Sequence, residues 1–201
     1  MTPDALAELI RSRAKSHQGR IMVALAGPPA SGKSTLAALL VASLGPGAKV
    51  LPMDGFHFDN AVLEARGHLS RKGAPHTFDV AGFAQCLSRI RTGEEVAIPI
   101  FDRHLELARA AADVIDPSDR IILAEGNYLL LDRPEWHVVT GLFDLKLLIR
   151  VDEDVLVQRL RDRWASFGKP DPEAWIAGND LPNARVVLAE SIGADLVLTG
   201  W

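Results

Sequence analysis

The sequence predicts an α/β fold in which helices cover both faces of a parallel sheet. Apolar runs of strand length recur along the chain, and segments with the spacing of amphipathic helices separate them. Strands that alternate with helices in this way form parallel sheets that are buried on both faces. The predicted strands lie at residues 21–26, 48–53, 96–101, 121–125, 143–151 and 194–199.

Length and composition favour one domain that acts on a small molecule. The 201 residues contain no repeat, low-complexity tract or linker, so we expect a single domain over 1–201. The formal net charge of −4 argues against an extended nucleic-acid surface. No apolar run is long enough to span a membrane, and Cys86 is the only cysteine. We therefore expect a cytoplasmic protein without nucleic-acid or membrane partners.

The first predicted strand leads into a phosphate-binding motif. Gly27-Pro-Pro-Ala-Ser-Gly-Lys-Ser34 matches Gly-x-x-x-x-Gly-Lys-Ser, and a predicted helix over 36–44 follows it, which is the context of a P-loop. Backbone N–H groups and the positive end of that helix favour a phosphate. We expect Lys33 to contact the β and γ oxygens of a nucleotide and Ser34 to ligate Mg²⁺. The predicted nucleotide-binding residues are Gly27, Ala30, Ser31, Gly32, Lys33, Ser34 and Thr35.

The segments on either side of the P-loop are predicted next. An amphipathic helix over 4–17 precedes the first strand. The polar segment 58–79 is typical of a functional loop with one short helix, and a helix over 80–92 follows it. Residues 104–118 fit either a helix or a set of short strands, and both alternatives stay open.

Helices dominate the predicted C-terminal third. One helix begins near residue 134, and a second runs from 152 or 153 to about 167, where Gly168-Lys-Pro170 breaks it. A further helix over 172–191 is predicted with an interruption at 179–183.

Two predicted strands end in an acid, Asp54 and Glu125. In open α/β sheets, ligands bind outside the carboxyl ends of the strands, so both side chains are expected to face the phosphate site. Asp54 is the candidate base that accepts the proton of a hydroxyl group, and Glu125 would bind Mg²⁺ directly or through water. The alternative for each is an acid in a helix cap or a surface turn.

Arg159 and Arg163 lie one helical turn apart, so their guanidinium groups can share a face. We expect them to act in catalysis from a lid over about 153–170 that closes over the phosphates and excludes water. The alternative is a solvated basic face that pairs with neighbouring acids.

A phosphate acceptor would lie against an insertion over about 55–118. Cations there could bind the acceptor, although loop cations are ordinarily solvated. His57 and Asp102 suit hydrogen bonds to hydroxyl groups, and Tyr128 is equally consistent with a pocket wall or the core. The candidate substrate-binding residues are His57, Arg66, Arg71, Lys72, Asp102, Arg103 and Tyr128.

Several motifs together resemble one family along nearly the whole chain. They are Gly27 to Ser34, Leu51 to His57, Arg66-Gly67, Arg71 to Asp79, Pro99 to Arg103, Glu125 to Leu130, and Arg159-Leu160. The set is similar to the uridine kinase, pantothenate kinase and phosphoribulokinase superfamily, and most to a bacterial subgroup named for fructose transport. This resemblance implies a three-layer P-loop fold with a five-stranded parallel sheet, and it implies Asp54 as base, Glu125 near Mg²⁺ and a lid from Glu153. Asn179, Asp180 and Asn183 also look like the subgroup, without an assigned role.

The residues and the resemblance predict an ATP- and Mg²⁺-dependent kinase that phosphorylates a hydroxyl group of a small metabolite. A sugar such as fructose is the preferred acceptor, because Gly55-Phe-His57 and the interrupted lid depart from uridine kinases. A nucleoside or pantothenate is the alternative acceptor. A regulatory nucleotide switch is the alternative of another class, although no Asn-Lys-x-Asp motif for guanine occurs. A monomer and a homodimer both stay open.

Overall fold

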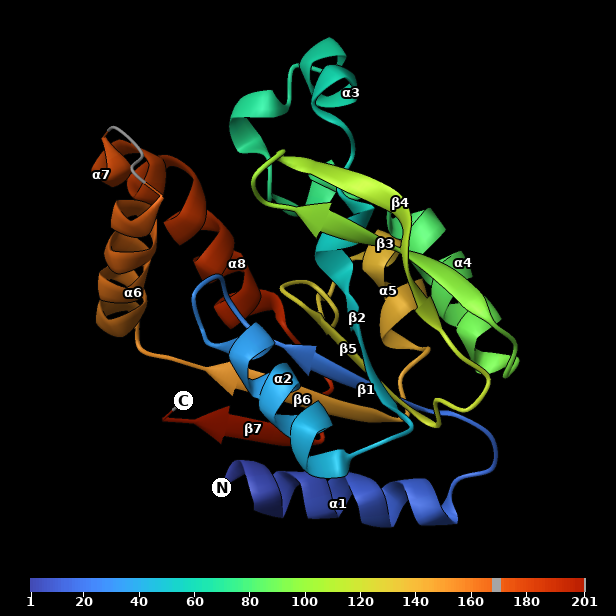
Figure 1. The fold of residues 1–201 in the computed structure, drawn as a ribbon. Helices are drawn as coiled ribbons and strands as arrows, with labels where there is room; N and C mark the ends of the chain where they lie inside the picture. Colours follow the sequence, from blue (N-terminus) through green and yellow to red (C-terminus); the bar gives the residue numbers. More distant parts are fainter. Residues whose placement is uncertain (168–170, 201) are drawn as a thin grey trace.

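The computed structural model describes residues 1–167 and 171–200 and arranges them in three layers (Figure 1). Within these residues, the central sheet has five parallel strands in the order β2-β5-β1-β6-β7. Their bounds are β1 Ile21–Ala26, β2 Ala48–Pro52, β5 Ile121–Gly126, β6 Leu145–Arg150 and β7 Leu196–Thr199. The predicted fold class is confirmed.

Helices occupy the segments in which the spacing of apolar residues predicts them. In the described residues, the elements outside the central sheet are α1 Pro3–Ser16, α2 Lys33–Leu44, α3 Asn60–Ala65, α4 Val80–Arg91, β3 Val96–Asp102, β4 Leu107–Ile115, α5 Pro134–Thr140, α6 Glu153–Ser166, α7 Pro172–Trp175 and α8 Leu181–Glu190. Short 3-10 turns follow β2 and flank the loop after α3.

Strand β1 organises the two cores of the molecule. All of its residues are buried, and successive side chains of a strand point to opposite faces of the sheet. Val23 and Leu25 pack with residues of α1 and α2 on one face. Met22 and Ala24 pack with residues of α4 and α5 on the other face. Burial on both faces explains why this strand is apolar throughout.

The segment 104–118, for which the sequence left a helix and short strands as alternatives, contains the strand β4. Strands β3 and β4 pair in antiparallel fashion and form a hairpin separate from the central sheet. The hairpin packs closely on the turn that follows β2. A Cβ atom at Gly55 would lie only 2.3 Å from the carbonyl oxygen of Pro99 in the hairpin. Glycine at this position therefore allows the close approach of the two backbones.

The predicted interruption at 179–183 is wrong. A single π-helical turn, Ile176–Asp180, connects α7 to α8. Pro182 lies in the first turn of α8, where proline is tolerated. The predicted break at 168–170 lies outside the described residues. In the part of the chain that the structure describes, no helix has the length and apolar character that crossing a membrane requires.

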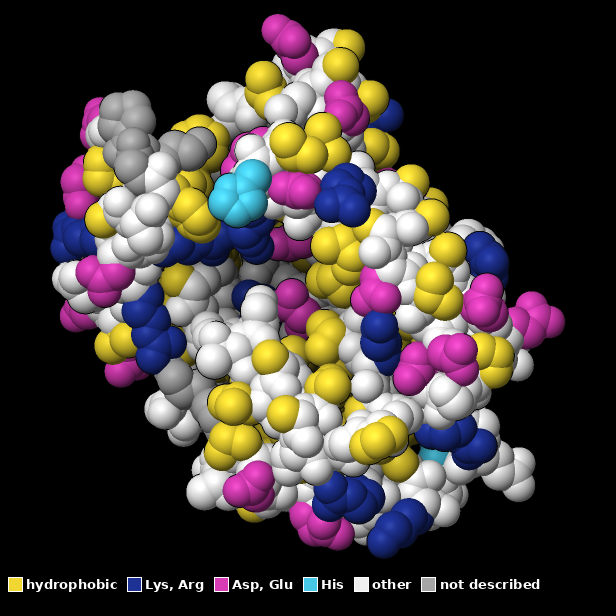
Figure 2. Space-filling view, in the orientation of Figure 1, with side chains coloured by type: hydrophobic (Ala, Val, Ile, Leu, Met, Phe, Trp, Pro, Cys, Tyr) yellow, Lys and Arg dark blue, Asp and Glu magenta, His cyan; other side chains and the backbone are white. Residues whose placement is uncertain are grey.

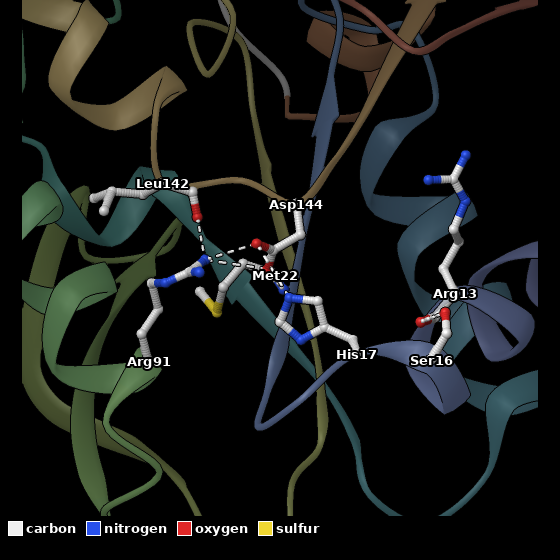
Figure 3. A network of polar contacts seen from close by, with 7 residues as sticks. All are labelled: Arg13, Ser16, His17, Met22, Arg91, Leu142 and Asp144. Carbon is white, nitrogen blue, oxygen red and sulfur yellow. Dashed lines mark hydrogen bonds and ion pairs between the residues drawn. The ribbon is translucent and has the colours of Figure 1, made fainter.

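Asp144 connects several elements at the amino ends of the parallel strands, the side of the sheet opposite the P-loop (Figure 3). Its carboxylate accepts a hydrogen bond from the Met22 backbone N–H at 2.8 Å and from the Arg91 guanidinium at 3.1 Å. His17 Nε2 lies 3.4 Å from the same carboxylate, and Arg91 also donates to the Leu142 carbonyl oxygen at 2.9 Å. One side chain thus joins the end of α1, strand β1 and helix α4.

We predict that Asp144→Ala lowers the free energy of unfolding by about 1–3 kcal/mol, because it leaves the buried Met22 N–H and the Arg91 guanidinium without this acceptor. Urea unfolding followed by circular dichroism measures the change. Asp132→Ala is the matched control, since its contact with His137 is exposed to solvent. Equal losses in both variants would contradict the assignment.

Candidate active site

A cavity of about 820 Å³ lies at the carboxyl ends of β1, β2 and β5. The P-loop lines its floor, α6 and the α7–α8 segment line one side, and residues of the β3–β4 hairpin and of the segment after β2 line the other. Figure 2 shows the hollow on this face, with basic and acidic side chains inside it. The position agrees with the general rule that ligands bind outside the carboxyl ends of parallel strands.

The P-loop has a backbone suited to a bound phosphate. Ala30 and Gly32 have left-handed φ values of 58° and 89°. Gly27 allows the tight turn, because a Cβ there would lie 2.9 Å from Ser31 Oγ. Helix α2 begins at Lys33 without a side-chain cap, so its first N–H groups are available to an anion. Ser31 Oγ is buried and has no hydrogen-bond partner among the described residues, which also fits a phosphate ligand.

Lys33 lies buried at the floor of the cavity, and its Nζ donates to the Pro28 carbonyl oxygen at 2.9 Å. Burial lowers the pKa of Lys33 to about 8, while the charges of Glu125 and Asp54 act in the opposite direction. A bound phosphate would add negative charge beside the ammonium and favour its protonated form.

Glu125 ends β5 beside the P-loop. It is buried, and its Oε1 accepts a hydrogen bond from Ser34 Oγ at 3.2 Å. Burial raises the pKa of Glu125, although the charge of Lys33 and the Ser34 hydrogen bond lower it. Gly126 brings the end of β5 close to the turn after β2, because a Cβ at 126 would lie 2.5 Å from Met53 Cβ. Glu125 and the turn that carries Asp54 are therefore neighbours.

The Ser34 hydroxyl and the Glu125 carboxylate together fit a magnesium site. Both are oxygen donors, and Mg²⁺ commonly takes one or two protein oxygens and completes its shell with water and phosphate oxygens. No group of three or more His, Cys, Asp or Glu in the described residues could enclose a metal by itself. The donor set thus suits a cation that is bound together with a nucleotide.

Asp54 follows β2 in a 3-10 turn and faces the same cavity. Arg103, at the turn of the β3–β4 hairpin, donates to Asp54 Oδ2 at 2.8 Å. Burial acts to raise the pKa of Asp54, but the charges of His57, Arg103 and Lys33 outweigh it and leave the pKa below its usual value. Asp54 is therefore ionised at neutral pH and able to accept a proton.

His57 lies beside Asp54 and is held in one orientation. Its Nδ1–H donates to the Asp54 carbonyl oxygen at 2.8 Å, since a carbonyl can only accept. Its ring contacts Phe78 and Phe101, with centroids 4.0 and 5.0 Å away. Burial lowers the pKa of His57, although the charge of Asp54 and the hydrogen bond to its carbonyl oxygen act in the opposite direction.

Helix α6 brings Arg159 and Arg163 to the cavity. Arg159 Nη1 lies 3.5 Å from the Ala30 carbonyl oxygen of the P-loop. Burial and the nearby charge of Arg103 lower the pKa of Arg163. Arg161, in contrast, pairs with Glu173 outside the cavity at 2.6 Å. The geometry favours the shared arginine face over the alternative of a solvated basic helix.

The remaining sequence-predicted residues divide into two groups. Lys72 lines the cavity, where its Nζ donates to Asn60 Oδ1 and to the Glu106 carbonyl oxygen, each at 2.7 Å. Four candidates are not among the described residues that line it, and neither is Gly27. They are Arg66, Arg71, Asp102 and Tyr128. Arg66 lies over the Phe58 ring, and Arg71 donates to the Gly178 carbonyl oxygen. Asp102 caps the hairpin turn and pairs with Arg109, whereas the fully buried Tyr128 donates to the Gly73 carbonyl oxygen.

The sequence did not predict a role for some of the residues that line the cavity. They are Phe78, Phe101, Trp164, Trp175, Asn179, Asp180 and Asn183. Two tryptophans within one charged C-terminal segment are the signal that could have pointed to an aromatic wall.

The comparisons with known proteins agree with this geometry. The family model described as AAA domain matches residues 23–175. A solved structure from Silicibacter sp. TM1040, described as a candidate fructose transport system kinase, is 44% identical, with a TM-score of 0.94 over 98% of this chain and 99% of that chain. A uridine kinase candidate, C227.14 of Schizosaccharomyces pombe, is 32% identical over 90% of this chain and 84% of its own length.

Pantothenate kinase of Coxiella burnetii is 30% identical over 77% of this chain, which spans 53% of the length of that enzyme. The names of these relatives are those of small-molecule kinases, and the P-loop of this chain is a nucleotide-binding motif. The chain therefore belongs to the family described as AAA domain, and it is a P-loop kinase of the superfamily that includes uridine kinase and pantothenate kinase, an ATP-dependent small-molecule kinase.

Proposed function

We propose that this kinase transfers the γ-phosphate of ATP to a hydroxyl group of a sugar, with fructose as the preferred candidate. The observation that carries the proposal is that the P-loop, an ionised Asp54 and three arginines line one cavity. The sugar preference is supported by the Silicibacter relative, whose description names fructose transport. A small acceptor and a cytoplasmic location also suit an acidic chain with one cysteine.

The nucleotide would lie along the P-loop. Its β-phosphate would accept hydrogen bonds from the first N–H groups of α2, and Lys33 would turn from the Pro28 carbonyl oxygen to the phosphate oxygens. A second cavity of about 630 Å³ adjoins this position and shares Arg159 with the first. Residues at the ends of β6 and β7 and residues of α6 and α8 line it, and we propose that it holds the nucleotide base.

The transfer step needs a base and cationic groups beside the acceptor. We propose that the acceptor occupies the part of the cavity lined by Asp54, His57 and Arg103, called its acceptor half below. The acceptor oxygen forms a bond to the γ-phosphorus, the bond from that phosphorus to the β,γ-bridging oxygen breaks, and the hydroxyl proton passes to the Asp54 carboxylate. Arg103 and Arg163 would stabilise the negative charge on the transferred phosphoryl oxygens. Helix α6, as a lid, would exclude water that could otherwise take the place of the acceptor.

Ser34 and Glu125 would hold Mg²⁺, which supplies charge neutralisation between the β- and γ-phosphates when it is bound. Their own contribution is positional, since the hydrogen bond between them already places a hydroxyl and a carboxylate at the mouth of the P-loop. A cation there would also offset the cost of the buried Glu125 charge.

The closest competing acceptors are nucleosides and pantothenate, which the names of the yeast and Coxiella relatives suggest. A regulatory nucleotide switch is the competitor from another class. A panel that contains fructose, other sugars, uridine, cytidine and pantothenate separates these readings. We expect a sugar to raise ATP consumption above the acceptor-free rate in the presence of Mg²⁺. If only uridine or pantothenate stimulates ATP consumption, that compound replaces the sugar as the acceptor. If ATP is hydrolysed without any acceptor as fast as with the best acceptor, the regulatory switch is favoured.

We predict that Asp54→Asn lowers acceptor-dependent turnover roughly 10²- to 10⁴-fold, because the amide cannot accept the hydroxyl proton. ATP binding should be retained, and fluorescence titration with a labelled nucleotide checks this. Asp132→Asn, an exposed position outside the cavity lining, is the control. Full turnover by the Asp54 variant would remove this residue as the base.

We predict that Glu125→Gln raises the Mg²⁺ concentration that supports half-maximal turnover by about tenfold or more, since a neutral amide holds the cation less tightly than a carboxylate. Turnover is measured against Mg²⁺ concentration at saturating ATP and acceptor. A curve that coincides with that of the unchanged protein would count against a role of Glu125 in metal binding.

A further inference from the structure

Three polar residues of the α7–α8 segment are buried beside the acceptor half of the cavity. Asn179, Asp180 and Asn183 have only 4%, 9% and 3% of their surface exposed, and all three line the cavity. Burying polar groups is costly unless they form hydrogen bonds. The partners of each side chain therefore indicate whether it serves the protein or a ligand.

The two asparagines are used within the protein. Asn179 Nδ2 donates to the Lys72 carbonyl oxygen at 2.8 Å, and Asn183 Nδ2 donates to Asn179 Oδ1 at 3.3 Å. Arg71 Nη2 in turn donates to Asn183 Oδ1 at 3.4 Å. These contacts join α8 to the loop 71–73. We assign the asparagines to positioning that wall of the cavity.

Asp180 differs from the two asparagines. Its Oδ2 accepts a hydrogen bond from Trp164 Nε1 at 2.7 Å, and within residues 1–167 and 171–200 no other hydrogen bond or ion pair to this carboxylate is formed. An ionised carboxylate can accept about four hydrogen bonds. Burial raises the pKa of Asp180, although the Trp164 hydrogen bond and the charge of Arg163 lower it. The carboxylate thus keeps unused acceptor capacity on a wall of the cavity.

The surroundings of Asp180 indicate the kind of group that it binds. Asp180 lies in the π-helical turn, a distortion that occurs often at functional sites. The rings of Trp164 and Trp175 lie 6.1 Å apart and nearly perpendicular, and both line the same cavity. Aromatic faces carry partial negative charge and suit the C–H groups of a small carbon skeleton, whereas a carboxylate suits its O–H groups. A polyhydroxylated molecule offers both.

We propose that Asp180 is a specificity-determining residue for the acceptor, and that its Oδ1 accepts a hydrogen bond from a hydroxyl group that is not the one phosphorylated. The site then selects small molecules with at least two hydroxyl groups. Asp54 and Asp180 belong to different elements that line the same cavity, so we assign them to different hydroxyl groups of the acceptor. The inference rests on the proposed function and concerns its acceptor half.

The test compares Asp180→Asn with the unchanged protein, using the panel compound that gives the highest turnover. We expect the KM for that acceptor to rise 10- to 100-fold, the effect of one hydrogen bond to a charged group, while kcat and the KM for ATP change less than about twofold. Asp180→Glu, which keeps the carboxylate, should recover part of the loss even if Asp180→Asn folds poorly. Asp162→Asn, on the exposed face of α6, is the control.

Monodeoxy analogues of the same acceptor identify the hydroxyl group. In the unchanged protein, one analogue should show a KM increase similar to that of Asp180→Asn, and this analogue should cause little further increase in the variant. If the KM increase caused by Asp180→Asn multiplies with the KM increase caused by the analogue, for every analogue tested, the proposal is overturned. An unchanged KM in Asp180→Asn would also overturn it.

The design separates this inference from the choice of a sugar as substrate. Uridine, cytidine and pantothenate each carry more than one hydroxyl group, so the comparison can be made with any of them. If uridine is the acceptor, the sugar proposal fails while the Asp180 proposal is still decided by the KM of its variants. If no compound raises turnover, the binding of fructose is measured by isothermal titration calorimetry with an ATP analogue bound. A signal in the unchanged protein that Asp180→Asn lacks supports the proposal, and its absence in both overturns it.

Discussion

The register of the parallel strands is the constraint on which the site depends. Glu125 on β5 lies opposite Leu25 of β1 on one side and opposite Pro52 of β2 on the other. Because neighbouring parallel strands end at the same edge of the sheet, the P-loop, Glu125 and Asp54 emerge side by side. A shift of β5 by one residue would turn the carboxylate to the other face of the sheet. Phosphate binding and metal binding are thus coupled through backbone pairing.

The charged groups of the site have hydrogen-bond partners within the protein. Lys33 donates to the Pro28 carbonyl oxygen, and Arg103 donates to Asp54. These contacts reduce the cost of burying charge. Under the proposed function, phosphate oxygens would take the place of these protein partners.

The sequence predicts the parts of the site that are encoded locally. The P-loop and the two strand-end acids depend on short motifs and on the order of strands and helices, and the structure brings them together as expected. Contacts between distant segments could not be predicted. Tyr128 packs in the core and its hydroxyl donates to the Gly73 carbonyl oxygen, and Asp180 accepts a hydrogen bond from Trp164 of α6. Asp102 is used by its own hairpin turn, whose formation the composition of 104–118 does not reveal.

Within the described residues, the β3–β4 hairpin forms a sheet separate from the central one. It joins the rest of the molecule through packing, including the contact at Gly55, and through side-chain contacts such as those of Arg103 with Asp54 and of Lys49 with Asp113. It nevertheless carries Arg103 and Phe101 into the cavity. Substitutions in its turn can therefore change the acceptor half while the central sheet and the P-loop keep their geometry. Such modularity offers a route by which related chains could diverge in acceptor preference and still inherit the same machinery for ATP.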